Sequence, residues 1–189
     1  MKYFLDTKFI ENGETIDLIS IGVVTDDKRE YYAISTDFDP WRAPEWIVQN
    51  VFPPLPDPLA GSMRNYSQWV GTGLQICISD PNFTDEQKGG ALLWRSPLQI
   101  KEEIREFCNP EKHGEPRFWA NYAAYNWVAL CQLFGPMINL PKGWPMFCMD
   151  LQQWSHHLGY SLPIQGDEKH NALEDARYNK MCWDYLYDQ

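Results

Sequence analysis

The chain opens with residues 1–24, MKYFLDTKFIENGETIDLISIGVV, and this stretch decides the fold. Two runs rich in β-branched and aromatic residues, KYFLDTKF and IDLISIGVVTDD, flank the segment ENGET, in which Asn12-Gly13 is a strong signal for a tight turn. A third run of the same kind, EYYAIST, follows the charged turn DDKR. The first third of the chain therefore predicts a three-strand antiparallel meander, with Asp6 at the end of its first strand.

The rest of the chain predicts mainly helices. SPLQIKEEIREFC has apolar residues at helical spacing, with Ser96 as N-cap and Pro97 at the first helical position. RFWANYA predicts a short buried strand. The segments PWRAPEWIVQNVF, AAYNWVALCQLFG, DLQQWSHHLG and HNALEDARYNKMCWDYLY predict further helices. Strands first, then a strand among helices, indicate an α/β protein with a mixed sheet.

Length and composition favour one domain. The 189 residues are 44% hydrophobic, which suffices for a single globular domain over residues 1–189. Residues 62–90 contain several glycines and the loop-like SDPNFTDEQ, and they show no sustained period. We expect an insertion there.

Charge and cysteine usage exclude several classes of protein. A formal net charge of −10 argues against a broad basic surface that binds nucleic acid through its phosphates. Five scattered cysteines without a CxxC pair favour a reducing cytoplasm. No stretch approaches the roughly 20 apolar residues of a membrane span, so we expect no membrane partner.

Four positions with charged or titratable side chains raise a chemical question. Period-two alternation places Asp6 and Lys8 on one face of the first strand, so that a lysine follows an acid within reach of the same ligands. Near the C-terminus, His170 precedes Asp175 by five residues at the start of the last helix. Taken singly, Asp6 is interpretable as a strand cap, His170 as an ordinary residue of the loop before the helix, and Asp175 as a solvated helix acid.

In this order, the segments resemble the DEDDh exonucleases. The blocks are FLDTKFIE, IDLISIGVV, EYYAIST, LWRSPLQI, AYNWVALCQLFGPM and HNALEDAR. They are most similar to small ribonuclease-T-like 3′-to-5′ exoribonucleases of bacteria and phages, including the mycobacterial adenylate-preferring type. The resemblance covers most of the chain outside the expected insertion. It implies a ribonuclease-H-like (DnaQ-like exonuclease) fold, with a mixed central sheet flanked by helices.

The family's chemistry uses four carboxylates that hold two Mg²⁺ or Mn²⁺ ions, and a histidine that acts as general base. By position, the resemblance makes Asp6 the first acid, Asp175 the fourth and His170 the base. Lys8 stands where the family has glutamate, and Asn126 where it has the third aspartate. The four positions therefore carry a formal charge of −1, which is the sum of −1, +1, 0 and −1, instead of −4.

Two hypotheses follow from these substitutions. In the first, Lys8 takes the place of a metal, neutralises Asp6 and Asp175 and offers its ammonium to a phosphate, so that the exoribonuclease is impaired or inactive. In the second, the chain is a catalytically inactive protein that keeps the fold and binds nucleic acid, a nucleotide or a protein partner.

The resemblance also implies partners and substrate contacts. The subgroup degrades single-stranded RNA from a free 3′ end, and homodimers are frequent in the family. Phe9 and Tyr125 are candidate base or sugar contacts, because aromatic rings stack on bases. Arg95 and Arg177 are candidate phosphate partners, with solvated or core-capping roles equally open.

Overall fold

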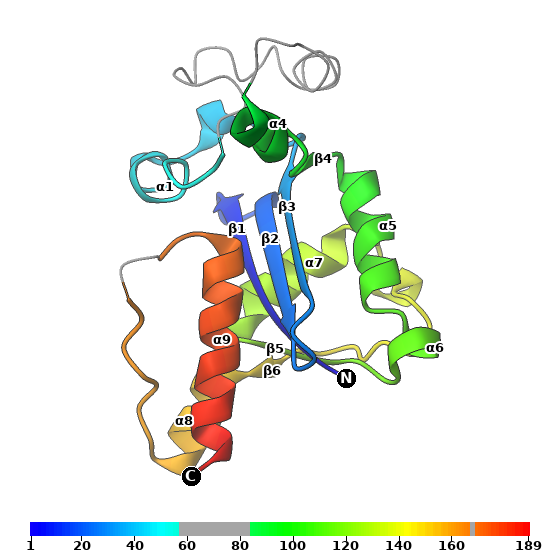
Figure 1. Ribbon diagram of the computed structural model, residues 1–189, viewed down its shortest axis with the longest axis vertical. Coiled ribbons are helices and arrows are strands. Elements are labelled where there is room, and N and C mark those ends of the chain that lie inside the picture. Colours follow the sequence, from blue (N-terminus) through cyan, green and yellow to red (C-terminus); the bar gives the residue numbers. More distant parts are fainter. Residues whose placement is uncertain (57–83, 167–168) are drawn as a thin grey trace.

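The computed structural model describes residues 1–56, 84–166 and 169–189 and shows three layers (Figure 1). A six-stranded mixed sheet of order β4-β3-β2-β1-β5-β6 forms the centre. Its strands are β1 (Lys2–Glu11), β2 (Ile16–Thr25), β3 (Glu30–Ser35), β4 (Trp94–Arg95), β5 (Arg117–Ala120) and β6 (Met149–Asp150). The helices α8 (Leu151–Leu158) and α9 (Ala172–Tyr187) cover one face, and α5 (Pro97–Phe107) and α7 (Ala123–Gln132) cover the other. The prediction of an α/β protein with a mixed sheet is confirmed.

Smaller helical elements complete the fold. They are the 3₁₀ segments η1 (Pro40–Arg42) and η3 (Met137–Asn139) and the helices α1 (Glu45–Asn50), α4 (Asp85–Ala91) and α6 (Pro110–His113). The helix α4 occupies the end of the range 62–90, in which the sequence shows no sustained period and for which it predicts an insertion. Residues 62–83 of the expected insertion lie outside the described part of the chain.

The N-terminal meander forms as predicted. Asn12 Oδ1 accepts hydrogen bonds from the backbone N–H groups of Glu14 and Thr15, and Gly13 supplies a φ of +85° between β1 and β2. The position of Asp6 differs from the prediction, because β1 continues to Glu11 and places Asp6 in its middle, opposite Gly22. The strand is longer than predicted since β2 pairs with it past Asp6, through a bulge between Lys8 and Phe9.

β5 is much shorter than β1, and this difference makes room for a site. β5 runs parallel to β1 and pairs with it only from Lys2 to Phe4. β5 ends at Ala120, and the chain then enters α7 at Ala123. The stretch of β1 from Asp6 to Phe9 therefore borders the carboxyl end of a parallel neighbour, which is the usual location of ligand sites in open α/β sheets.

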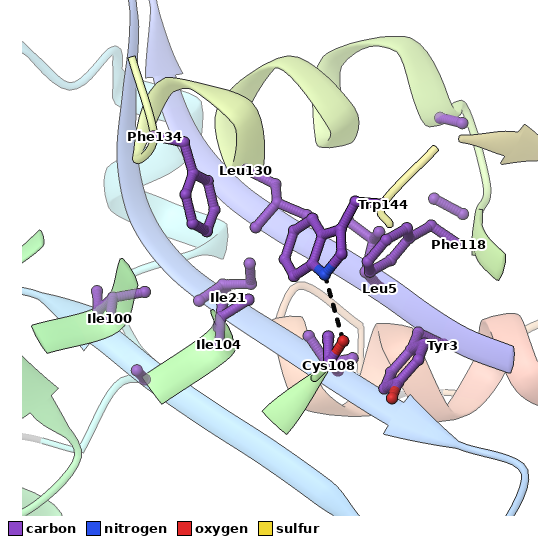
Figure 2. Packing of buried hydrophobic residues seen from close by; sticks show 14 residues of the cluster. Tyr3, Leu5, Ile21, Ile100, Ile104, Cys108, Phe118, Leu130, Phe134 and Trp144 are labelled. Atoms are coloured by element: carbon purple, nitrogen blue, oxygen red, sulfur yellow. Dashed lines mark hydrogen bonds between the residues drawn. The ribbon is translucent and has the colours of Figure 1, made fainter. Parts of the chain in front are cut away.

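The two faces of β1 differ in character. Its core face carries Tyr3 and Leu5, which are fully buried in the main hydrophobic cluster (Figure 2). The cluster also contains Ile21, Ile100, Ile104, Phe118, Leu130, Phe134 and Trp144. The charged face of β1 carries Phe4, which packs against Trp183 of α9, and then Asp6 and Lys8, of which Lys8 forms an ion pair with Asp175 of α9. Strand alternation thus separates an apolar core from charged groups.

Local sequence signals explain where the helices begin. Ser96 and Gln99 form a capping box at the start of α5, and Asn171 Oδ1 caps α9 by accepting from the N–H groups of Leu173 and Glu174. The predicted start of α5 is therefore confirmed, whereas α9 begins at Ala172, two residues after the start of the segment predicted to form it.

Trp144 closes the core on the side of α5 and α7. Its indole Nε1 donates to the carbonyl oxygen of Cys108 at 3.2 Å (Figure 2).

Cys108, Cys131, Cys148 and Cys182 are free thiols. Among the described residues, no helix has the length and apolar content needed to cross a bilayer.

Candidate active site

A pocket of about 320 Å³ lies where β1 passes the end of β5. Neutral polar and aromatic side chains make up most of its wall, and two carboxylates complete it. The lining residues are Asp6, Thr7, Phe9, Asn121, Tyr122, Tyr125, Asn126, Gln165, Asp175, Tyr178 and Asn179. Residues from β1, α7 and α9 meet here because β5 ends before it can cover this part of β1.

Lys8 and two acids form a compact ion cluster beside the pocket. Lys8 Nζ lies 2.6 Å from Asp6 Oδ2 and also forms an ion pair with Asp175 Oδ2. The three side chains are only 13%, 12% and 13% exposed, respectively. These contacts are the ones that the hypothesis of a lysine between Asp6 and Asp175 requires. We call these three residues the charge cluster.

Gly22 explains how Asp175 reaches Asp6. A Cβ atom at Gly22 would overlap the backbone of Ala172 and lie 2.5 Å from the Cα of Leu173. The first turn of α9 therefore lies directly against β2 at Gly22, which is the residue that pairs with Asp6 in the sheet. Sequence reasoning missed this residue, although a glycine inside a strand of β-branched residues is a recognised signal for close backbone approach.

Asn126 is held as an amide on the core side of the pocket. Its Oδ1 accepts from Thr7 N at 2.7 Å and from Thr7 Oγ1 at 2.8 Å, and its Nδ2 donates to the carbonyl oxygen of Asn121 at 3.0 Å. A carboxylate in this orientation would set an oxygen against the Asn121 carbonyl. The asparagine is therefore matched to its neighbours, and its contacts fasten α7 to β1.

Burial governs the protonation of Asp6, and the charges of Lys8 and Asp175 act on it in opposite directions. Desolvation raises the pKa of Asp6 to about 6; the Asp175 carboxylate adds to the rise, and the Lys8 ammonium opposes it. Burial alone would lower the pKa of Lys8, but attraction by the carboxylates of Asp6 and Asp175 outweighs it and the pKa is raised. With all three groups ionised, the charge cluster carries −1.

The residues present do not fit a two-metal centre. Mg²⁺ and Mn²⁺ favour sites with several oxygen ligands, chiefly carboxylates. Here an ammonium group lies against both Asp6 and Asp175, and the carboxamide of Asn126 is already bonded to Thr7 and Asn121. In the described ranges, no group of three or more Asp, Glu, His or Cys side chains is arranged to hold a metal.

His170 lies on the loop that enters α9. Its backbone has a φ of 71°, and its imidazole meets the indole of Trp46 edge to face at 5.0 Å between ring centres. Burial lowers its pKa, the positive charge of Lys8 lowers it further, and Asp175 opposes the change. His170 is thus electrostatically coupled to the charge cluster without lining the pocket.

Aromatic rings form one wall of the pocket. Phe9 and Tyr125 both line it and stack with 5.8 Å between ring centres and 9° between their planes. Tyr122, which has a left-handed backbone, and Tyr178 also line the pocket and were missed from the sequence. Gln165, which donates to Asp175 Oδ1, was missed as well, because no local pattern marks it.

The structure does not bring the two candidate arginines to the pocket. Arg95 lies on β4, which β3 and β2 separate from β1, and its Nε donates to Glu103 at 2.9 Å. Arg177 pairs with Glu30 at 2.8 Å from Nε to Oε1 and also with Glu174. Both guanidinium groups are thus paired with carboxylates, and neither lines the pocket.

The mixed sheet, with acids on its first strand and on its last helix, fits an α/β fold of the nuclease class. Comparison with known proteins identifies the family: residues 81–187 match the 3′-5′ exoribonuclease Rv2179c-like domain. The chain is 40% identical over 178 residues to 3′-5′ exoribonuclease Rv2179c of Mycobacterium tuberculosis strain H37Rv, and equally to 3′-5′ exoribonuclease MT2234.1 of strain CDC 1551. Each alignment covers 94% of this chain and 88% of the relative. The chain therefore belongs to the Rv2179c-like 3′-5′ exoribonuclease family.

Proposed function

We propose that this chain is a 3′-to-5′ exoribonuclease of the DEDDh type and of ribonuclease-H-like fold, acting on single-stranded RNA in the cytoplasm, whose hydrolysis is impaired in the present sequence. The membership of the family and the names of its relatives support the exoribonuclease part. The ion pairs from Lys8 to Asp6 and Asp175 are the single observation that carries the impairment.

Electrostatics sets the scale of the impairment. Two unit charges about 4 Å apart interact by about 4 kcal/mol at an effective dielectric of about 20, and a divalent ion roughly doubles this value. In the proposal, Asp6 and Asp175 are metal ligands of the parent activity and His170 is its general base. Lys8 replaces an attraction for Mg²⁺ or Mn²⁺ by a repulsion, and Asn126 removes a second negative charge.

A second candidate function is binding without catalysis. The pocket keeps Phe9 and Tyr125 and a mostly neutral polar wall, which support retention of a nucleic-acid or nucleotide ligand. Arg95 forms an ion pair with Glu103, and Arg177 with Glu30. The proposal therefore assigns neither arginine a phosphate contact. The homodimer that the resemblance implies belongs to either function.

The test is degradation of a 5′-labelled oligoadenylate by four proteins: the present chain, Lys8→Glu, Asn126→Asp and the double variant. Each is assayed with Mg²⁺ or Mn²⁺ and with a chelator. We expect the double variant to release nucleotides at least about a hundredfold faster than the present chain, because metal ligation contributes several kcal/mol to such reactions. The chelator should abolish the difference.

His170 provides the matched control. His170→Ala in the double variant should remove the restored activity while leaving folding, measured by circular dichroism, unchanged. Metal-dependent degradation by the present chain at the rate of the double variant would contradict the impairment. Absence of degradation by all four proteins, with oligoadenylate bound in chelator, would favour the binding function.

A further inference from the structure

We propose that the pocket binds an uncharged ligand with a planar base, a free nucleoside, in preference to the corresponding nucleotide. The inference rests on the proposed function in one respect, since it takes the ligand from the breakdown products of nucleic acid. It goes beyond that function by assigning the selectivity of the pocket to the charge cluster. The sequence hypothesis has the ammonium of Lys8 contact a phosphate, so it predicts the opposite preference, for the nucleotide over the nucleoside.

The charges around the pocket disfavour a phosphate. Asp6 and Asp175 line the pocket, and Lys8 pairs with both of them, so that the three charges sum to −1. Among the described residues, the lining includes no charged side chain besides these two carboxylates. The ammonium of Lys8 has three N–H donors, of which two are directed to the carboxylates, and its side chain is only 13% exposed. An incoming phosphate would thus meet net negative charge in a poorly solvated site, where repulsion is stronger than in water.

The uncharged part of the wall suits a base and a sugar. Tyr125 is 53% exposed and Tyr122 is 67% exposed, so both offer ring surface on which a base can stack. Asn121 also lines the pocket, and its Oδ1, which is buried in the wall, has no hydrogen-bond partner among the described residues. Exocyclic amino groups and ribose hydroxyls are the donors that such an acceptor lacks.

The size of the pocket agrees with this ligand. Its volume of about 320 Å³ lies at the lower end of the range for small-molecule sites, which is about 300–1,000 Å³. A single nucleoside is a small molecule of this kind, whereas an RNA strand extends beyond such a cavity and carries a phosphate at each step. Volume, aromatic wall and charge therefore point to the same class of ligand.

The test measures binding of adenosine and of adenosine 5′-monophosphate to the full chain in chelator, by isothermal titration calorimetry. We expect adenosine to bind at least about tenfold more tightly than the nucleotide. Equal or tighter binding of the nucleotide would overturn the proposal, because it would show that the charge cluster does not disfavour a phosphate. Absence of binding by both ligands would overturn it as well.

Two variants separate charge from stacking. Asp175→Asn brings the charge cluster from −1 to 0, so the preference for adenosine should shrink severalfold. Tyr125→Leu should weaken both ligands by a similar factor, while Tyr125→Phe should preserve both affinities because the ring remains. A preference that is unchanged in Asp175→Asn would contradict the electrostatic origin.

The outcome is separable from that of the RNA degradation test. If adenosine is not bound while the double variant Lys8→Glu, Asn126→Asp degrades RNA, the nucleoside proposal fails and the exoribonuclease proposal stands. If adenosine is bound selectively while that variant is inactive on RNA, the exoribonuclease proposal fails and the nucleoside site stands.

Discussion

The core face and the charged face of β1 are built from alternate residues of one strand, yet they depend on different forces. Tyr3 and Leu5 on the core face are fully buried among aromatic and aliphatic side chains, including Phe118 and Trp144. Asp6 and Lys8 on the charged face are also poorly exposed, but their neighbours there are the carboxylate of Asp175 and each other. The comparison shows that neighbouring positions of one strand can be buried to a similar degree, one in apolar packing and the next in an ion-paired cluster.

The two faces should respond to different perturbations. The core face is stabilised by apolar burial, so its contribution should vary with side-chain volume and little with pH or added ions. The charged face balances desolvation against attraction within the charge cluster, so its contribution should vary with pH and with divalent cations. Four measurements test this division, beginning with the largest expected effect.

Truncation on the core face should cost the most stability. Phe118 is 1% exposed and lies within 5.5 Å, between ring centres, of Tyr3, Trp127 and Trp144. Phe118→Ala should lower the free energy of unfolding by about 3–5 kcal/mol, because it leaves a cavity. Urea denaturation measures this loss, and the loss should be the same at pH 5 and pH 7. Phe118→Leu, which fills part of the volume, should lose less.

Removal of the cation should destabilise the charged face in a manner that metal reverses. Lys8→Glu in chelator should cost about 3 kcal/mol, because it leaves three carboxylates together. Mg²⁺ at 100 times its dissociation constant should return about 2.7 kcal/mol. Thermal unfolding with and without Mg²⁺ measures both effects. The expectation would be contradicted if Mg²⁺ left the melting temperature of Lys8→Glu unchanged, or if it raised the melting temperature of the present chain by as much as that of the variant.

A methyl group at the contact between β2 and α9 should separate the charged residues without changing any charge. Gly22→Ala should lower the free energy of unfolding by about 1–3 kcal/mol, because the new Cβ overlaps the backbone at Ala172. Gly166→Ala is the matched control, since a Cβ there meets no atom within 4 Å. Equal stabilities of the two variants in urea denaturation would show that α9 adjusts freely to β2.

The smallest expected effect is a pH dependence that belongs to Asp6. Its pKa is raised from 3.8 to about 6 on folding, so the folded protein binds more protons than the unfolded chain between these values. The contribution of Asp6 is therefore full below about pH 4 and is lost as pH rises through about 6. Between pH 5 and pH 6 the loss should be about 1 kcal/mol.

The Asp6 effect is measured as a difference from Asp6→Asn, which lacks the titrating group. Urea denaturation of both proteins at pH 5 and pH 6 isolates it from all other carboxylates. A larger loss for Asp6→Asn than for the present chain over this interval would reverse the sign and show that Lys8, rather than burial, controls the pKa of Asp6.

Local chemistry made much of the fold predictable. The Asn12-Gly13 turn fixed the first hairpin, and Ser96 with Pro97 fixed the start of α5, because these signals act within a few residues. The ion pair between Lys8 and Asp6 follows from period-two alternation in a strand. The pair between Lys8 and Asp175 required the family resemblance, since 167 positions separate the two residues.

Other features depend on tertiary contacts that no local pattern encodes. The length of β1 past Asp6 follows from its pairing with β2, and the bonds from Asn126 to Thr7 follow from the way α7 packs on the sheet. The candidate arginines failed to reach the pocket for the same reason. Arg95 has Glu103 as a neighbour across α5 and β4, and Arg177 has Glu30 across α9 and β3.

Lys8 also changes the relation between the site and its surroundings, because its charge is attached to the backbone. The ammonium is attached to β1 through the Lys8 side chain, only two residues from Asp6. Its local concentration is therefore set by the length of that side chain and does not depend on the medium. A free metal ion that binds Asp6 and Asp175 must displace the Lys8 ammonium, which cannot diffuse away because it is covalently attached to the chain. A single side chain thus makes the counterion of this site a heritable property of the sequence, where a metalloenzyme obtains its own from solution.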